Sequence, residues 1–278
     1  MQNNITRESH LVTSAQIKGN CQNVGMSQSS PRSRRTTIGT RRRRRILALA
    51  ALVVVAVALG YGTYRLIPSR TTQLAGELVQ RVETDEQIVA LTFDDGPTDA
   101  DADAVLEALA QRGVVATFYL NGRDIEENPD AMQAIIAGGH EIGNHTWSHR
   151  SMTFVTIDTV SDEVESTDAA IRAAGYEGPI TFRPPFGNKL LTLPLYLAQH
   201  DRITVTWDVS AEDYSGVKQS SSEIVNATVG LTSPGSISLL HPWFGRTSTQ
   251  QATGEVIDLL QAQGYRFVTV SELIEQQR

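Results

Sequence analysis

The sequence predicts an α/β fold in which about seven parallel strands alternate with helices, and three observations support this. Short apolar runs alternate with segments of helical periodicity from residue 87 to the end of the chain. Glycines stand where four of the expected helices end, at Gly113, Gly138, Gly175 and Gly264. Seven strands separated by six helices are typical of a parallel sheet, either closed into a barrel or open and doubly wound.

The expected strands and helices follow one another along the chain. The strands are residues 88–93, 115–120, 140–142, 180–183, 203–209, 236–240 and 267–270. The helices are residues 101–112, 129–137, 157–174, 193–199, 221–229 and 250–263, the second of which starts with a proline suited to a first turn. Because ligands of such folds bind at the carboxyl ends of the strands, we expect functional residues there.

Charge is unevenly divided along the chain. Residues 1–45 contain ten Lys or Arg and one Glu, a net charge of +9, whereas the whole chain carries −7. Residues 46–278 therefore carry −16. Nucleic-acid binding depends on Lys and Arg, so we expect no nucleic-acid partner for this acidic part.

The N-terminal region predicts a tail and a membrane anchor. Residues 1–45 are polar and basic, which indicates a disordered cytoplasmic tail. Residues 46–64 are uncharged and apolar, follow five consecutive arginines, and are long enough to span a bilayer as a single-pass signal anchor. The folded part would then lie outside the cell. The alternative is a secreted protein cleaved near Ala58, but a 45-residue leader is unusually long for a signal peptide.

The remaining chain divides into a linker and one domain. Residues 65–86 are expected to form a polar linker or a short lead-in helix, and residues 87–278 a catalytic domain large enough to bury a core. The only cysteine, Cys21, belongs to the tail. The domain therefore has neither a disulfide framework nor a thiolate metal site.

Two adjacent carboxylates, Asp94 and Asp95, follow the first expected strand in the sequence TFDDGP. Neighbouring side chains at a strand exit point to different sides, so one carboxylate can bind a metal while the other acts as a base. Asp, Gly and Pro are also common in turns, so this motif alone leaves a plain turn open.

A histidine pair, His145 and His149, follows the third expected strand in the sequence HTWSH. Four residues apart, the two imidazoles would lie on one face of a helical turn. Two histidines and a carboxylate, with open positions for water and substrate, form a common catalytic metal site. A surface pair is the alternative, although the chain has only six histidines. We interpret His140, inside the strand, as structural.

Three later strand exits also carry charged or titratable side chains. Arg183 precedes two stiffening prolines and could hold Asp94, lowering its pKa. His241 follows the sixth strand, and an acid from the neighbouring exit would make it an oriented general acid. A rim salt bridge and a core histidine are the alternatives. Five of seven exits carrying such groups, all facing one rim, favour a catalytic site.

These motifs, in this order, resemble those of the polysaccharide deacetylase family, also called the NodB-homology domain or carbohydrate esterase family 4. The resemblance covers about residues 87–274. It implies a distorted (β/α) barrel with fewer than eight strands. It further implies a metal-dependent enzyme that removes acetyl groups from a polysaccharide.

The resemblance also assigns roles to the motif residues. It implies Asp94 as catalytic base, positioned by Arg183, and His241 as general acid, oriented by Asp213. The implied ligands of the divalent metal, zinc with cobalt, manganese or nickel as alternatives, are Asp95, His145 and His149.

The wall of the expected pocket departs from the family pattern at two positions. Ser210 and Tyr214 stand where many members carry Asp and Trp, which bears on the tuning of His241. The side chains expected to bind substrate are Phe93, Tyr119, Pro185, Phe186, Trp207, Tyr214 and Leu239.

The anchor makes peptidoglycan amino sugars the favoured substrate, with chitooligosaccharides and acetylxylan as alternatives. A catalytically inactive glycan-binding homologue, or an assembly protein that acts through the basic tail, are the rivals from other classes of protein. The retained motif residues argue against both.

Overall fold

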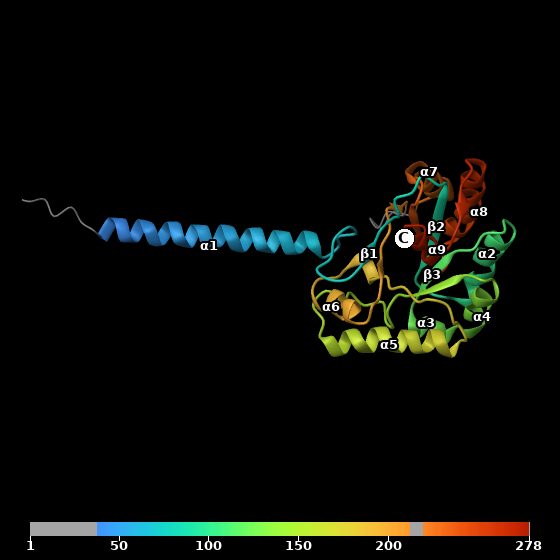
Figure 1. Ribbon diagram of the computed structural model, residues 1–278, viewed down its shortest axis with the longest axis horizontal. Coiled ribbons are helices and arrows are strands. Elements are labelled where there is room, and N and C mark those ends of the chain that lie inside the picture. The colour runs from blue at the N-terminus through green and yellow to red at the C-terminus, as the bar shows by residue number, and fades with distance from the viewer. Residues whose placement is uncertain (1–37, 212–218, 278) are drawn as a thin grey trace, which may run out of the picture. The chain divides into compact units, whose positions relative to one another are not determined.

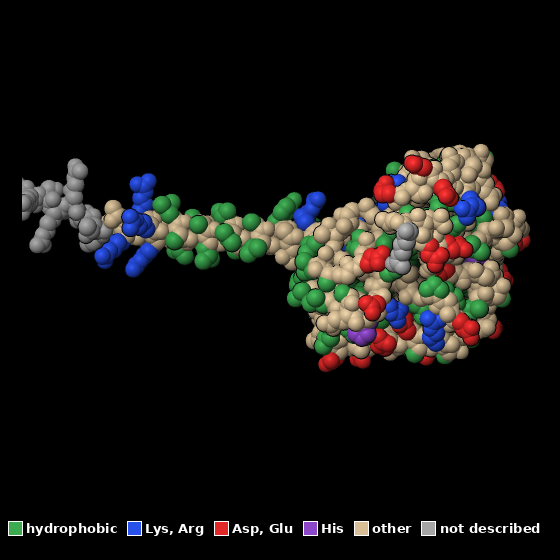
Figure 2. All heavy atoms as spheres, viewed as in Figure 1, with side chains coloured by type: hydrophobic (Ala, Val, Ile, Leu, Met, Phe, Trp, Pro, Cys, Tyr) green, Lys and Arg blue, Asp and Glu red, His purple; other side chains and the backbone are tan. Residues whose placement is uncertain are grey.

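The computed structural model describes residues 38–211 and 219–277 (Figure 1). The chain divides into two units, Met1–Leu52 and Val53–Arg278, with the boundary inside the first helix, α1 (Ile38–Leu66). By length and composition, residues Gly39–Leu66 could cross a membrane. Figure 2 shows arginines gathered near the first residues of α1 and mostly apolar side chains along the rest, with Arg65 in the last turn.

Helix α1 starts earlier than the sequence predicts. Residues 1–37 of the expected tail lie outside the described residues, whereas residues 38–45 are helical rather than disordered. Arginine is a good helix former, and extending an existing helix is far easier than nucleating one. The apolar segment therefore carries the arginine run into the same helix.

The predicted α/β architecture is confirmed, and the described strands pair in parallel. Strands pair in the order β4-β3-β2-β7-β6, with β8 on the first residues of β2, and β1 pairs with β5. Phe182 forms parallel bridges to Asn144 and Thr204, so β4 continues toward β5 in one distorted barrel. The bounds are β1 (Leu78–Val79), β2 (Ile88–Asp94), β3 (Thr117–Leu120), β4 (Glu141–Asn144), β5 (Thr204–Val205), β6 (Val209–Ser210), β7 (Ile237–Leu240) and β8 (Arg266–Phe267).

The helices lie on the outside of the strands (Figure 1). All six predicted helices are present within a few residues of their expected bounds, and α3 and α9 are additional. They are α2 (Asp99–Ala110), α3 (Gly122–Glu127), α4 (Pro129–Ala137), α5 (Ile157–Ala173), α6 (Thr192–Gln199), α7 (Ser221–Leu231), α8 (Thr247–Ala262) and α9 (Val270–Glu275).

Strand β2 divides two hydrophobic cores because its side chains alternate between its faces. Val89, Leu91 and Phe93 pack in the core that β2 shares with the outer helices. Ile88 and Ala90 pack in the second core, inside the barrel. The same alternation directs the next even-numbered residues, Thr92 and Asp94, inward.

Three expected strands differ most from their predicted bounds. Residues 180–183 pair only through Phe182. Residues 203–209 divide into β5 and β6, because the Asp208 carboxylate accepts the backbone N–H of Ile237 at 2.8 Å in place of a strand carbonyl. Residues 267–270 end early because Thr269 caps α9 in a capping box with Glu272.

The predicted linker is wrong over its second half, which belongs to the domain. Leu78 and Val79 form β1 on the edge of β5, and Val82 is completely buried. The Val82 N–H donates to the Gly235 carbonyl at 2.9 Å. A few apolar residues within a polar stretch suffice here because β5 offers them an open strand edge.

Replacing Gly235 with Ala should destabilise the domain at this junction. Gly235 has φ +78°, and a Cβ there would overlap the Val82 carbonyl oxygen. Gly139 is the matched control, with φ +72° and nothing within 4 Å of its Cβ position. We expect Gly139→Ala to lower the free energy of unfolding by about 1 kcal/mol, and Gly235→Ala by about 1–3 kcal/mol more. Urea unfolding measures both, and equal losses would contradict the docking of this segment.

Candidate active site

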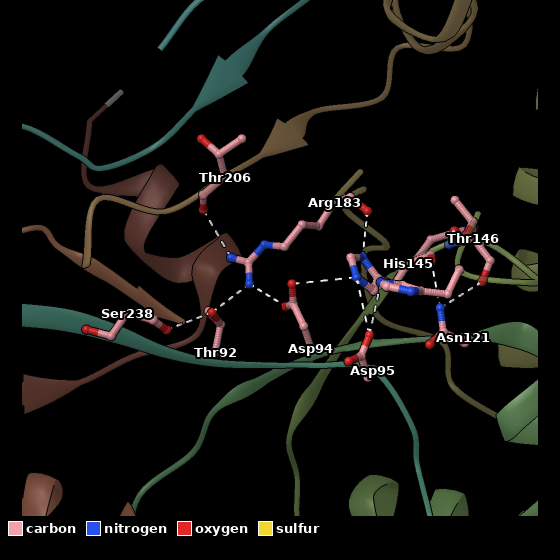
Figure 3. Close-up of polar contacts among 11 residues, drawn as sticks. Thr92, Asp94, Asp95, Asn121, His145, Thr146, Arg183, Thr206 and Ser238 are labelled. Atoms are coloured by element: carbon pink, nitrogen blue, oxygen red, sulfur yellow. Dashed lines mark hydrogen bonds and ion pairs between the residues drawn. The ribbon is translucent and has the colours of Figure 1, made fainter. Parts of the chain in front are cut away.

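The two carboxylates at the end of β2 point in different directions (Figure 3). Asp94, the last residue of β2, is 2% exposed and shares the inward face with Thr92. Asp95 has left-handed backbone, φ +74°, which turns its carboxylate toward the histidine loop. The next residue must be small, because a Cβ on Gly96 would lie 2.7 Å from the buried Trp243 ring.

The two histidines converge on Asp95. His149 Nε2 lies 3.1 Å and His145 Nε2 3.8 Å from Asp95 Oδ1. His145 Nδ1 lies 2.7 Å from the Arg183 carbonyl, so a proton on Nδ1 leaves the Nε2 lone pair facing the carboxylate. The pair does not lie on the helical turn that the spacing suggested. Positive φ angles at Thr146 and His149 fold a loop that brings the rings together instead.

Hydrogen bonds from neighbouring elements hold this loop. Asn144 Oδ1 accepts the Thr146 N–H at 2.8 Å, and Asn121 Nδ2 donates to the His145 carbonyl at 2.8 Å. From α5, the Glu163 carboxylate accepts the Ser148 N–H at 2.8 Å and hydroxyl at 2.6 Å. These supporting residues were not predicted from the sequence; asparagines at two consecutive strand exits were the available signal.

Arg183 is completely buried and binds the second carboxylate. Its Nη1 donates to Asp94 Oδ1 at 2.6 Å and to Thr92 Oγ1 at 2.7 Å, and its Nη2 donates to the Thr206 carbonyl at 3.1 Å. The guanidinium carbon lies 4.0 Å from the centre of the Tyr119 ring. Arg183 therefore fixes one oxygen of Asp94 and leaves the other, Oδ2, 3.6 Å from His145 Nε2.

The two carboxylates and the two histidines line a cavity of about 450 Å³. Its lining is Asp94, Asp95, His145, His149, Phe186, Trp207, Leu239, His241 and Arg246. Four separate strand exits contribute to this list, together with the loop that follows Arg183. Of the strand-exit residues singled out from the sequence, those at this cavity are Asp94, Asp95, His145, His149 and His241.

The cluster of Asp95, His145 and His149 fits a divalent metal ion. One ligand atom from each lies within 4.8 Å of the others. Asp95 Oδ1 is buried without a hydrogen-bond donor although it faces two imidazole nitrogens. Burial also lowers the pKa of His145 to about 3, which keeps its ring neutral, as a metal ligand must be.

Comparison with known proteins agrees with this site. The sequence profile of the polysaccharide deacetylase family matches residues 81–204. A peptidoglycan-N-acetylglucosamine deacetylase from Bacillus cereus is 35% identical over 190 residues, which cover 67% of this chain and 68% of that protein. The chain belongs to the polysaccharide deacetylase family.

Solved polysaccharide deacetylases share the fold. A peptidoglycan N-acetylglucosamine deacetylase, crystallised with 4-naphthalen-1-yl-N-oxidanyl-benzamide, has a TM-score of 0.66 and 31% identity, covering 70% of this chain and 91% of that one. A family 4 acetyl xylan esterase from Clostridium thermocellum, solved with cobalt, has a TM-score of 0.63 and 31% identity. The match covers 68% of this chain and 91% of that one. Enzymes of this family are metal-dependent hydrolases of acetyl groups.

The substrate-binding residues expected for a polysaccharide deacetylase are only partly at the cavity. Phe186, Trp207 and Leu239 line it. Phe93 is completely buried against Phe118 on the opposite face of β2, because an odd-numbered residue there points outward. The prediction that Phe93 binds substrate is therefore wrong.

Tyr119 and Pro185 also lie behind the cavity surface. Tyr119 is completely buried beneath Arg183, and its hydroxyl is 2.9 Å from Thr181 Oγ1. Pro185 is buried in a 3-10 turn, Pro185–Gly187, that presents Phe186 at φ +58°. Both act as supports in this deacetylase rather than as lining. Arg246, which does line the cavity, was not singled out from the sequence.

Two predicted residues lie outside the described residues, Asp213 and Tyr214. Their roles as the acid that orients His241 and as pocket wall stay predictions. Ser210 ends β6 and is half-buried. His140 is buried away from the cavity and accepts the Ala116 N–H at 3.3 Å, in keeping with its structural interpretation.

Burial raises the pKa of Asp94 above its ordinary value, outweighing the lowering by Arg183 and His241. Arg183 lowers the pKa of Asp94, as the sequence predicted, but the burial of the carboxylate was not predicted and raises the pKa by more. The loss of hydration around a fully buried carboxylate exceeds the attraction of the charges beside it. A carboxylate with a raised pKa holds a proton more firmly, which suits a general base.

The metal-free deacetylase should lose stability on acidification. Burial lowers the pKa of His140 to about 4, from 6.5. Between these two values the unfolded state binds more protons, so the free energy of unfolding falls as the pH falls. His140→Asn should therefore flatten this dependence between pH 6.5 and 4 by up to about 1.4 kcal/mol per pH unit. Urea unfolding in chelator at several pH values measures it; an unchanged slope would show that His140 titrates normally in the folded state.

Proposed function

We propose that this chain deacetylates peptidoglycan amino sugars outside the cytoplasm. The observation that carries the proposal is the convergence of Asp94, held by Arg183, with the cluster of Asp95, His145 and His149 in one cavity. Two of the similar proteins described above are peptidoglycan N-acetylglucosamine deacetylases, which favours peptidoglycan over other acetylated glycans.

Asp94 is the proposed general base. A divalent ion held by the Asp95 cluster, zinc in this proposal, would polarise the acetyl carbonyl and lower the pKa of the attacking water. Asp94 Oδ2 accepts a proton from that water as its oxygen bonds to the acetyl carbon. Arg183 keeps Oδ1 occupied at 2.6 Å, so the free oxygen is the one available for proton transfer.

His241 is the proposed general acid. It follows β7, is 7% exposed, and lines the same cavity as Asp94. When the C–N bond breaks, the leaving nitrogen takes a proton from His241, which yields acetate and a free amino sugar. Phe186 packs against His149 with ring centres 4.7 Å apart, and with Trp207 offers apolar surface to the sugar.

Helix α1 is the proposed membrane anchor. Its arginine run would remain in the cytoplasm and its tyrosines would lie at the outer interface, with the catalytic domain outside the cell. The alternative is release of the domain by cleavage near Ala58. Either arrangement brings the enzyme to the cell wall.

Acetate release from peptidoglycan, chitooligosaccharides and acetylxylan, with and without chelator, tests the proposed function. Asp94→Asn should lower kcat by about 10²–10⁴-fold while metal stays bound, because only the proton acceptor is removed. Asp95→Asn should lose both metal and activity. Metal content is measured by mass spectrometry. Unchanged turnover by Asp94→Asn would remove Asp94 from its role, and release from acetylxylan alone would favour an esterase, as in the Clostridium relative.

His241→Gln should separate amide from ester cleavage. An amine leaves only when protonated, whereas p-nitrophenolate leaves as an anion. We expect a loss of about 10²-fold or more on N-acetyl glycans and a much smaller loss on p-nitrophenyl acetate. His200→Gln, at the end of α6, is the matched control and should change neither rate. Equal losses on both substrates would contradict the acid role.

A further inference from the structure

The segment that follows α1 packs against the wall of the active site. Lys189, 1% exposed, donates its backbone N–H to the Ile67 carbonyl at 3.0 Å and its Nζ to the Ser69 carbonyl. Thr206 Oγ1 donates to the Arg70 carbonyl at 2.7 Å. Bonds at both ends therefore fix the backbone of residues 67–70 beside the loop that carries Phe186.

The Arg70 side chain lies against this wall. Its guanidinium carbon is 5.8 Å from the centre of the Trp207 ring, and Trp207 lines the cavity. The Trp207 side chain is 8% exposed, whereas Arg70 is exposed. Within the part of the chain that the structure describes, no carboxylate forms an ion pair with Arg70. Its positive charge is thus held near the cavity.

This charge stands out in an acidic domain. Residues 46–278 carry a net −16, yet Arg246 lines the cavity and Arg70 lies at its Trp207 wall. Cations around a cleft favour ligands of opposite charge and suppress neutral competitors. A guanidinium stacked on an aromatic ring still presents its edge, with N–H groups spaced to bind the two oxygens of a carboxylate.

We propose that Arg70 is a specificity-determining residue that binds a carboxylate on the glycan next to the acetylated sugar. This inference rests on the proposed function and narrows its substrate to acidic glycans. The alternating chain of N-acetylglucosamine and N-acetylmuramic acid is one, because the lactyl group of muramic acid ends in a carboxylate wherever it carries no stem peptide. Lys189 and Thr206 are positioning residues that hold the Arg70 backbone in place.

The test compares one glycan in two charge states. Full-length protein is assayed for acetate release from a peptidoglycan tetrasaccharide and from the same tetrasaccharide with its carboxylates converted to methyl amides. Arg70→Met should raise KM for the acidic form about tenfold, the usual effect of losing a charge-assisted hydrogen bond, with kcat unchanged. KM for the amidated form should change less than about twofold. Arg70→Lys should recover part of the loss.

Arg266→Met is the matched control. Arg266 is exposed on β8, which pairs with the first residues of β2, at the opposite end of that strand from Asp94. Arg266→Met removes the same charge as Arg70→Met and should leave KM unchanged for both the acidic and the amidated form. An equal rise in KM for both forms in Arg70→Met would mean that Arg70 only supports Trp207. An unchanged KM for both forms would mean that Arg70 does not contribute to substrate binding. Either result overturns the inference while leaving the proposed function intact. Failure of the wild-type protein to release acetate from either form would overturn both.

Discussion

The buried contact between Arg183 and Asp94 is the interaction on which the rest of the site depends. A buried guanidinium loses its hydration, which is costly unless several partners replace the water. Arg183 has three such partners: Asp94, Thr92 and the Thr206 carbonyl. Removing one partner of such a pair typically costs about 3–5 kcal/mol, because the other charge stays buried. The contact joins β2 to the segments on either side of β5, so the geometry of the barrel also sets the orientation of the Asp94 carboxylate.

The same residue also contacts the cluster of Asp95, His145 and His149 through its backbone. The Arg183 carbonyl contacts His145 Nδ1, so the segment that orients the Asp94 carboxylate also orients the His145 imidazole. Around it the backbone is strained: Asp95, Thr146, His149 and Phe186 all have positive φ. Such conformations persist only where surrounding contacts determine them, and Asn121, Asn144 and Glu163 supply these contacts. These contacts hold the strained loops in place, so that the side chains of Asp95, His145 and His149 converge on one point.

The start of the domain is tied to the chemistry in a comparable way. Residues 67–70 pack beside Lys189 and Trp207, and β1 pairs with β5 soon afterwards. The chain that follows α1 thus packs against the cavity wall before it enters the barrel. In a membrane-bound enzyme, only a few residues would then separate the anchor helix from the segment that packs against the cavity wall.

The sequence by itself determined the order of strands and helices and the residues at the strand exits. These follow from local properties: the period of the apolar residues, the glycines that end helices, and the spacing of Asp94, Asp95, His145 and His149. Only the tertiary structure decided which exits meet, where β1 docks, and that Phe93 faces the outer core while Arg246 reaches the cavity. It also decided that burial, which raises the pKa of Asp94, outweighs Arg183, which lowers it. Strand pairing and loss of hydration depend on residues distant in sequence, so no local pattern encodes them.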